Sequence, residues 1–120
     1  MLPNDETIIR GERAADGAAL VWINDSVLLP HVVHHSPTGF EWSYGGSGPA
    51  DLALSILAFV IGPEQETVRI HEGRVGEIAW RLYQAFKREF VAGWPHEGGW
   101  SITVGEVRQW IARQSQIHGE

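Results

Sequence analysis

The chain has 120 residues, a formal net charge of −6 and 43% hydrophobic residues, among them six Trp. This length holds one packed core, so we expect a single domain over residues 1–120. The chain contains no cysteine, which excludes disulfides, thiolate metal sites and a cysteine nucleophile.

Basic residues are few and unevenly placed. No Lys or Arg lies between Arg13 and Arg69, and Lys87 is the single lysine. Nucleic-acid binding depends on cations that neutralise phosphates, so we expect no nucleic-acid partner. The acidic balance suits either a protein partner with a basic surface or simple solubility.

The N-terminus lacks the basic start and apolar run of a signal peptide. The apolar run in the middle of the chain is shorter than the ~20 residues of a membrane span. We therefore expect a cytoplasmic protein that does not enter a membrane.

The first third of the chain predicts strands. Thr7–Arg13 and Ala19–Ile23 flank Asp16-Gly17, a dipeptide typical of tight hairpin turns, and Val27–Leu29 continues in extended form. These segments indicate an antiparallel meander.

Phe40–Ile61 is the stretch whose local signals agree best. Aromatic and polar residues alternate in Phe40–Tyr44, which predicts a strand covered on one face. The glycine corner, Gly45–Pro49, follows, with Ser47 expected to cap the next helix. Ala50–Ile61 is apolar nearly all round and predicts a central helix that is buried on most sides.

The remaining chain predicts one strand and two helices. Thr67–His71 alternates like a short strand, and apolar residues recur at helical spacing over Val75–Gly93. Thr103 and Glu106 have the spacing of a capping box, which predicts a last helix of two to three turns before frayed residues 115–120. The predicted fold is therefore α+β, with a small antiparallel sheet of three to five strands packed against about three helices.

The glycine corner permits two interpretations. Its backbone N–H groups at Gly46, Ser47 and Gly48 suit an anion site at a helix start. No P-loop lysine follows, however, and Asp51 in the expected first turn repels a phosphate. The alternative, which we favour, is a corner whose glycines allow close packing.

The sequence gives less support to a catalytic serine and to a histidine metal site. Gly45–Pro49 nearly matches the G-x-S-x-G nucleophile elbow, with Ser47 as the nucleophile, but Pro49 replaces the last glycine. A nucleophilic Ser47 would also need a histidine within hydrogen-bonding distance of its hydroxyl, and the candidates are His34, His35 and His96. His31 and His35 share one face of an extended segment while His34 points the other way. We therefore expect neither catalytic residues nor a metal site.

Partner contacts are expected at the rim of the central stretch. Glu41, Ser43 and Asp51 are predicted to point outward. Trp94 and Trp100 flank a turn and are candidates for an exposed interface pair, because indoles concentrate at binding hot spots.

The string HSPTGFEWSYGGSGPADLALSIL at His35–Leu57 carries a family resemblance. Further matching positions are Tyr83, Phe86, Lys87, Trp100, Thr103, Glu106 and Trp110. On these residues the chain resembles a family of small uncharacterised proteins of bacteria, phages and other mobile elements. The resemblance implies no activity, but it implies a phage or mobile-element accessory protein.

We expect a non-enzymatic protein that occupies a surface of a host protein, such as a defence component, in the manner of an anti-CRISPR protein, and that needs no cofactor. The alternative is a small-ligand or nucleotide-binding enzyme that uses the glycine corner at Gly45–Pro49.

Overall fold

The computed structural model describes residues 3–36 and 38–118, with side chains up to residue 114. The elements along the chain are β1 (Ile8–Arg13), β2 (Ala19–Ile23), β3 (Val27–Leu28), α1 (Ser47–Ile61), β4 (Thr67–Ile70), β5 (Gly73–Gly76), α2 (Glu77–Glu89), the 3₁₀ helix η1 (Val91–Gly93), β6 (Trp100–Thr103) and α3 (Val104–His118).

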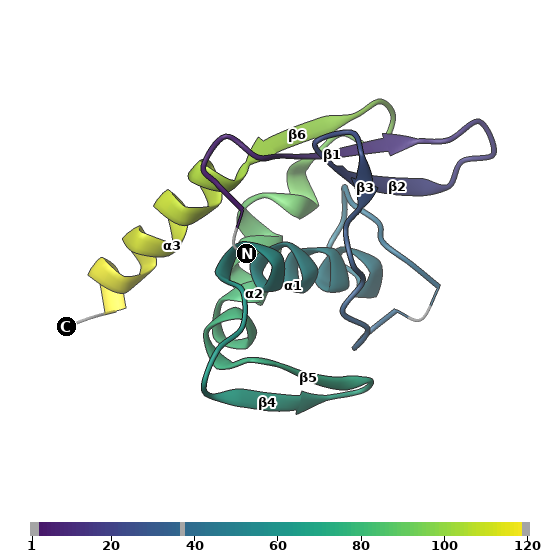
Figure 1. Cartoon of the computed structure of the whole chain (residues 1–120). Coiled ribbons are helices and arrows are strands. Elements are labelled where there is room, and N and C mark those ends of the chain that lie inside the picture. The colour runs from purple at the N-terminus through teal and green to yellow at the C-terminus, as the bar shows by residue number, and fades with distance from the viewer. Residues whose placement is uncertain (1–2, 37, 119–120) are drawn as a thin grey trace.

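Figure 1 shows α1 between two β layers. An antiparallel sheet with the order β3-β2-β1-β6 lies on one side of α1, and the β4–β5 hairpin lies on the other. With these two sheets and the three α-helices of the described residues, the predicted α+β class is confirmed.

The predicted N-terminal hairpin is confirmed. β1 pairs with β2 around a turn in which Gly17 has a φ of +89°. Asn24 and Asp25, with φ values of +51° and +58°, turn the chain into the short strand β3. Asn and Asp tolerate this left-handed region better than most residues, which explains their place in the turn.

The opposite edge of the sheet comes from the C-terminal part of the chain. β6 pairs with β1, so that Ile102 faces Ile9 and Trp100 faces Gly11. A Cβ on Gly11 would collide with the indole ring of Trp100. Glycine at this position therefore lets the ring lie flat against β1.

Residues 40–44 do not form the predicted strand. Trp42 is fully buried, but Tyr44, expected on the same face, is 49% exposed. Ser43 has a φ of +81°, which turns the chain between the two rings. The Ser43 N–H donates to the Val91 carbonyl at 3.0 Å, so a contact with η1 holds this bend.

α1 begins earlier than predicted. Its N-cap is Gly46, and no side chain caps it, so Ser47 is the first helical residue and does not act as the cap. The expected burial is confirmed, since residues from Gly48 to Leu57 are all buried. Gly62, with a φ of +79°, ends the helix and donates its N–H to the Ala58 carbonyl.

The predicted strand at Thr67–His71 is confirmed as β4, but the following helix starts later than Val75. Val75 pairs with Val68 in the β4–β5 hairpin, and α2 starts at Glu77. The Glu64 carboxylate accepts the N–H groups of Ile78 at 2.8 Å and Ala79 at 3.2 Å. A side chain from the preceding loop thus caps α2.

The predicted capping box of α3 is confirmed. The Glu106 carboxylate accepts the Thr103 N–H at 2.8 Å, and the Thr103 hydroxyl accepts the Glu106 N–H at 3.1 Å. The helix is longer than predicted and continues to His118. Residues 119–120, at the end of the segment expected to fray, lie outside the described residues.

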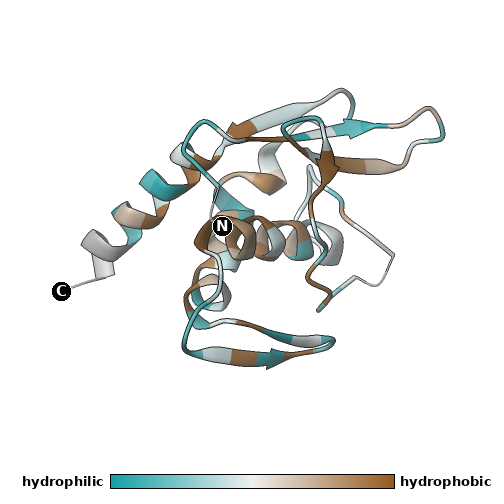
Figure 2. Ribbon diagram, viewed as in Figure 1, coloured by the Kyte–Doolittle hydropathy of each residue, from teal (hydrophilic) through white to brown (hydrophobic). Residues whose placement is uncertain are grey.

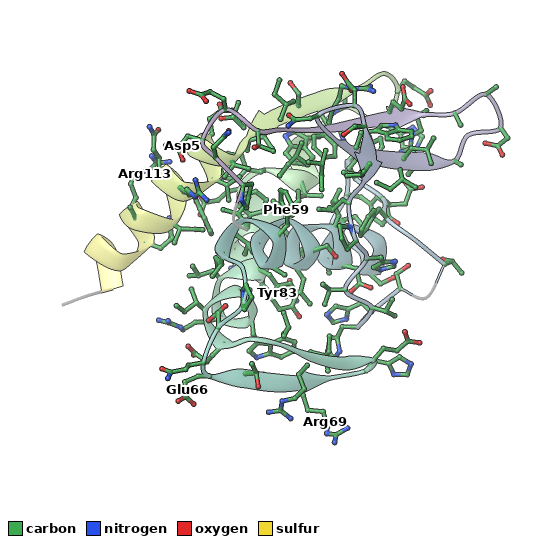
Figure 3. The ribbon with its side chains drawn as sticks, in the orientation of Figure 1. Asp5, Phe59, Glu66, Arg69, Tyr83 and Arg113 are labelled. Carbon is green, nitrogen blue, oxygen red and sulfur yellow. The ribbon has the colours of Figure 1, made fainter. Side chains whose placement is uncertain are left out.

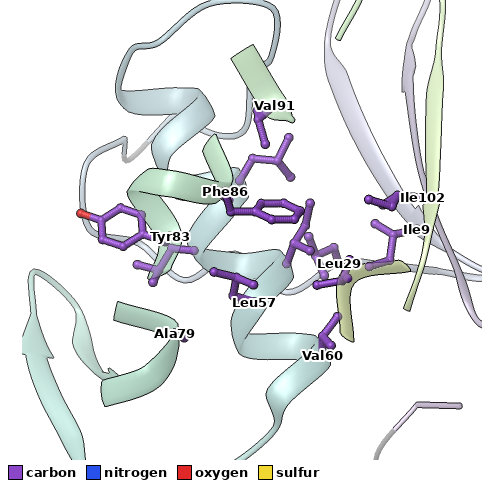
Figure 4. Close-up of a cluster of buried hydrophobic side chains, with 14 of the residues drawn as sticks. Ile9, Leu29, Leu57, Val60, Ala79, Tyr83, Phe86, Val91 and Ile102 are labelled. Carbon is purple, nitrogen blue, oxygen red and sulfur yellow. The ribbon is translucent and has the colours of Figure 1, made fainter. Parts of the chain in front are cut away.

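The core fills the space between the sheet and the helices. Figure 4 shows Ile9 and Ile102 from the sheet pointing toward α1, where Leu57 and Val60 lie, and Phe86 reaching in from α2. Figure 2 shows the apolar residues concentrated along α1 and on the facing strands. Among the described residues, no helix has the length and apolar character needed to cross a membrane.

Candidate functional site

Asp51 anchors the segment 31–36 to α1. Its carboxylate is 0% exposed and accepts the backbone N–H groups of His34 at 3.1 Å, His35 at 2.8 Å and Ser36 at 2.9 Å. Nε2 of His31 lies 2.9 Å from the same carboxylate. The expectation that Asp51 points outward is therefore wrong, because the segment 31–36 covers this side of α1.

The Asp51 carboxylate stays charged in this buried position. Burial by itself would raise its pKa, but hydrogen bonds from the Ser36 N–H, from His31 and from the His35 and His34 N–H groups together hold the pKa below its ordinary value. Because these groups occupy the buried carboxylate, it is not available to a partner.

The three histidines of the segment have separate partners. Nδ1 of His34 accepts the His71 N–H at 3.0 Å, and Nε2 of His35 lies 2.8 Å from the Tyr83 hydroxyl. Burial, and next the neighbouring His34, lower the pKa of His35. Within residues 3–36 and 38–118, no group of three His, Asp or Glu side chains is placed to hold a metal ion.

The glycine corner packs against its own neighbours. A Cβ on Gly46 would collide with the Tyr44 ring, and one on Gly48 would lie 2.8 Å from Cβ of Glu41. Ser47 is exposed, and the first turn of α1 carries no acidic residue, contrary to the expected place of Asp51. Close packing therefore accounts for the glycines at 46 and 48.

Glu41 forms an ion pair inside the molecule. Its carboxylate accepts two hydrogen bonds from Arg13, at 2.9 and 2.8 Å, and the Arg13 guanidinium lies over the Trp42 ring, 4.5 Å from its centroid. The hydrogen bond from Arg13 lowers the pKa of Glu41 although burial opposes this. Glu41 is about one-third exposed, and its charge is already matched.

Trp94 and Trp100 do come together, but they do not form an exposed pair. Their rings stack with centroids 3.9 Å apart, and Trp100 also meets Trp42 edge to face at 5.5 Å. Trp100 is only 7% exposed and belongs to the core, while Trp94 is partly buried. The predicted exposure of Trp100 is wrong because β6 places it over Gly11.

A surface cavity of about 550 Å³ lies beside these rings. It is lined by Trp100 together with Arg10, Gly11, Glu12, Arg13, Gly98, Gly99 and Ser101. The glycine corner does not contribute to it.

The solvent face of the four-stranded sheet carries exposed apolar residues that were not predicted as a binding site from the sequence. Ile9, Val21 and Ile102 occupy the core face, so the alternating residues lie on the outer face. There Trp22 lies directly opposite both Leu28 and Arg10.

We call Ile8, Trp22 and Leu28 the sheet patch. Ile8 is 44% exposed and Leu28 is 53% exposed, and Trp22 lies between their strands. Val27, at the same edge, is 55% exposed. The signal for this patch lay in the strand alternation, which placed large apolar residues on both faces of the hairpin.

Charged side chains flank the sheet patch. Arg10 donates to Asp25 at 2.6 Å and to Glu12 at 3.2 Å, and the Trp22 indole donates to Glu12 at 2.8 Å. This last bond, and next the one from Arg10, lower the pKa of Glu12. The group holds two carboxylates and one guanidinium, so the border of the patch is acidic.

Comparison with known proteins gives one match. A model of a family of unknown function (DUF6166) matches residues 9–113, a range that includes Trp22, Leu28, Asp51 and the glycine corner. A search of the curated proteins found no match, and a search of the solved structures found none either. The chain belongs to this family of unknown function, DUF6166.

Proposed function

We propose that the protein is a non-enzymatic binding protein whose sheet patch contacts a protein partner with a basic surface. The observation that carries this proposal is the exposure of Ile8 and Leu28 around Trp22 on the outer face of the four-stranded sheet. Antiparallel sheets commonly leave one face to solvent, but that face is then usually polar.

The composition of the patch fits an interface. Tryptophan and arginine are enriched where proteins meet, and an apolar centre with a polar rim is the usual arrangement. Here Trp22 forms the centre, while Arg10, Glu12 and Asp25 form the rim. The acidic rim and the net charge of −6 favour a partner that presents lysine or arginine.

The biological setting belongs to the same proposal. The resemblance of His35–Leu57 to proteins of phages and mobile elements supports such an origin and action in the cytoplasm of a bacterial host. An accessory protein that covers a surface of a host protein needs no catalytic residues, and a host defence component is the partner class that we put first.

Capture from bacterial lysate with matched variants tests the proposal. Leu28→Lys places a charge in the sheet patch that repels a basic partner, whereas Tyr44→Lys makes a similar change at an exposed aromatic residue outside the sheet patch. We expect a basic protein to be captured by the wild type and by Tyr44→Lys, and at least about tenfold less by Leu28→Lys. Identical capture by all three proteins contradicts the role of the patch.

A nucleotide-binding enzyme at the glycine corner has less support. Gly46 and Gly48 pack on Tyr44 and Glu41, and the neighbouring carboxylate of Asp51 is occupied by the segment 31–36. A thermal-shift panel of nucleotides and inorganic phosphate separates the two functions, because a ligand of the folded state raises the melting temperature.

A further inference from the structure

A groove runs along the C-terminal half of α1, and none of the sheet-patch residues lines it. Three surface hollows of about 190, 430 and 370 Å³ follow one another there. The first two share Val32 and Ala58, and the last two share Pro63 and Glu64. We call these three adjoining hollows the α1 groove.

The floor of the α1 groove is an uncovered part of the central helix. Residues 48–57 of α1 are buried, but Ala58, Phe59 and Ile61 are only partly so. Ala58 and Phe59, with Pro30 and Val32, form the apolar end of the groove. Figure 3 labels Phe59 on α1 and Glu66 just before β4.

The other end of the groove is acidic. Glu64, Glu66 and Glu77 line it together with Gln65 and Ile78. Glu64 is engaged by the N–H groups at the start of α2, and Glu77 pairs with Arg81 at 3.3 Å. Glu66 is exposed, and its backbone carbonyl accepts the Glu77 N–H at 2.9 Å.

The basic residue within the groove is held by its own hairpin. Arg74 donates from Nε to the Thr67 hydroxyl at 2.8 Å and from Nη2 to the Thr67 carbonyl at 3.1 Å. Its guanidinium is thereby directed along β4. The groove thus changes from apolar at Phe59 to acidic at Glu66.

We propose that the α1 groove binds an extended peptide segment of a protein in which apolar side chains are followed by lysine or arginine. The apolar side chains occupy the hollow over Ala58 and Phe59, and the basic ones lie against Glu66. A track of linked, shallow hollows fits a chain better than a compact ligand, which is usually enclosed by a single pocket. This inference goes beyond the proposed function and rests on different residues.

Fluorescence anisotropy with designed peptides tests the proposal. The probe is a short fluorescein-labelled peptide with a leucine-rich half followed by a lysine-rich half, and its match carries glutamate in place of every lysine. We expect the lysine peptide to bind at least about tenfold more tightly than the glutamate peptide, because lysine is attracted to the acidic end of the groove and glutamate is repelled by it. Equal binding of the two peptides, or no binding of either, overturns the proposal.

Variants locate the binding. Ala58→Gln fills the shared wall of the first two hollows without adding charge and should weaken lysine-peptide binding at least about tenfold, and Glu66→Gln should weaken it about twofold to fivefold. Leu28→Lys, in the sheet patch, should leave it unchanged. If Ala58→Gln does not fold, as judged by circular dichroism, Phe59→Ala takes its place. If the groove variant still binds the lysine peptide, or if Leu28→Lys loses the binding, the peptide does not bind in the α1 groove. Either result leaves the lysate experiment on the sheet patch unaffected.

Discussion

Asp51 shows how one side chain can organise a segment that has no regular structure. Residues 31–36 belong to neither a helix nor a strand, so their backbone N–H groups lack the usual partners. The buried carboxylate supplies acceptors for three of these groups and contacts His31 as well. Its role in the molecule is structural.

We expect Asp51→Ala to lower the free energy of unfolding by about 3–5 kcal/mol, because it leaves the buried Ser36 N–H and the partly buried N–H groups of His34 and His35 without their acceptor. Urea unfolding followed by tryptophan fluorescence measures the change. Glu97→Ala is the control, since that side chain is 89% exposed, and we expect it to stay within about 0.5 kcal/mol of the wild type. A loss below about 1 kcal/mol for Asp51→Ala shows that the anchor is dispensable.

The stability of the wild type and of Asp51→Ala can also be compared as a function of pH. Burial opposes the charge of Asp51, but its hydrogen bonds prevail and depress the pKa in the folded state. Such a carboxyl contributes its full stability above its unfolded pKa of about 4 and loses it as the pH falls through the lower folded pKa. The difference in stability between the wild type and Asp51→Ala should therefore narrow below about pH 4. If the difference in stability does not change with pH, the Asp51 carboxylate does not stabilise the protein through its charge.

Elements whose signals are local could be predicted from the sequence. The turn at Asp16-Gly17, the apolar run of α1 and the capping box at Thr103 and Glu106 all depend on residues close together in the chain. Each of these predictions gave the right element, and the errors lie at the helix ends.

Elements that depend on remote contacts could not be predicted. The bend at Ser43 is held by Val91, and the start of α2 is capped by Glu64. The same reason explains the errors at the candidate site. Trp100 is buried because β6 pairs with β1, and Asp51 is buried because the segment 31–36 covers it. Neither contact follows from a local pattern.

The pairing of β1 with β6 gives a prediction at this scale. Gly11→Ala places a methyl group where the Trp100 ring lies, and that ring is held by Trp94 and Trp42. We expect a loss of about 1–3 kcal/mol in the free energy of unfolding, measured by thermal or urea denaturation. Gly45→Ala is the matched control, because a Cβ there meets no atom within 4 Å. Equal stability of the two variants shows that the ring moves aside without cost.

At the scale of the whole molecule, the segment 31–36 contacts both α1 and the turn of the β4–β5 hairpin. Asp51 fixes the segment to α1, while the Val33 carbonyl accepts the Glu72 N–H at 3.2 Å and His34 accepts the N–H of His71. The β4–β5 hairpin thus contacts a segment that the Asp51 carboxylate holds against α1. The single domain over residues 1–120 stays a prediction.

This arrangement predicts that the β4–β5 hairpin opens before the four-stranded sheet. The hairpin has two strands and buries Ile70 and Val75, whereas β1 has partners on both sides and places Ile9 in the core. Hydrogen–deuterium exchange followed by mass spectrometry should show faster exchange in β4 and β5 than in β1, because local opening costs less where fewer contacts are lost. Asp51→Ala should accelerate exchange in the hairpin far more than in β1, and Gly11→Ala should do the reverse. If both variants raise exchange uniformly, the layers open as one unit and the segment 31–36 is not the link between them.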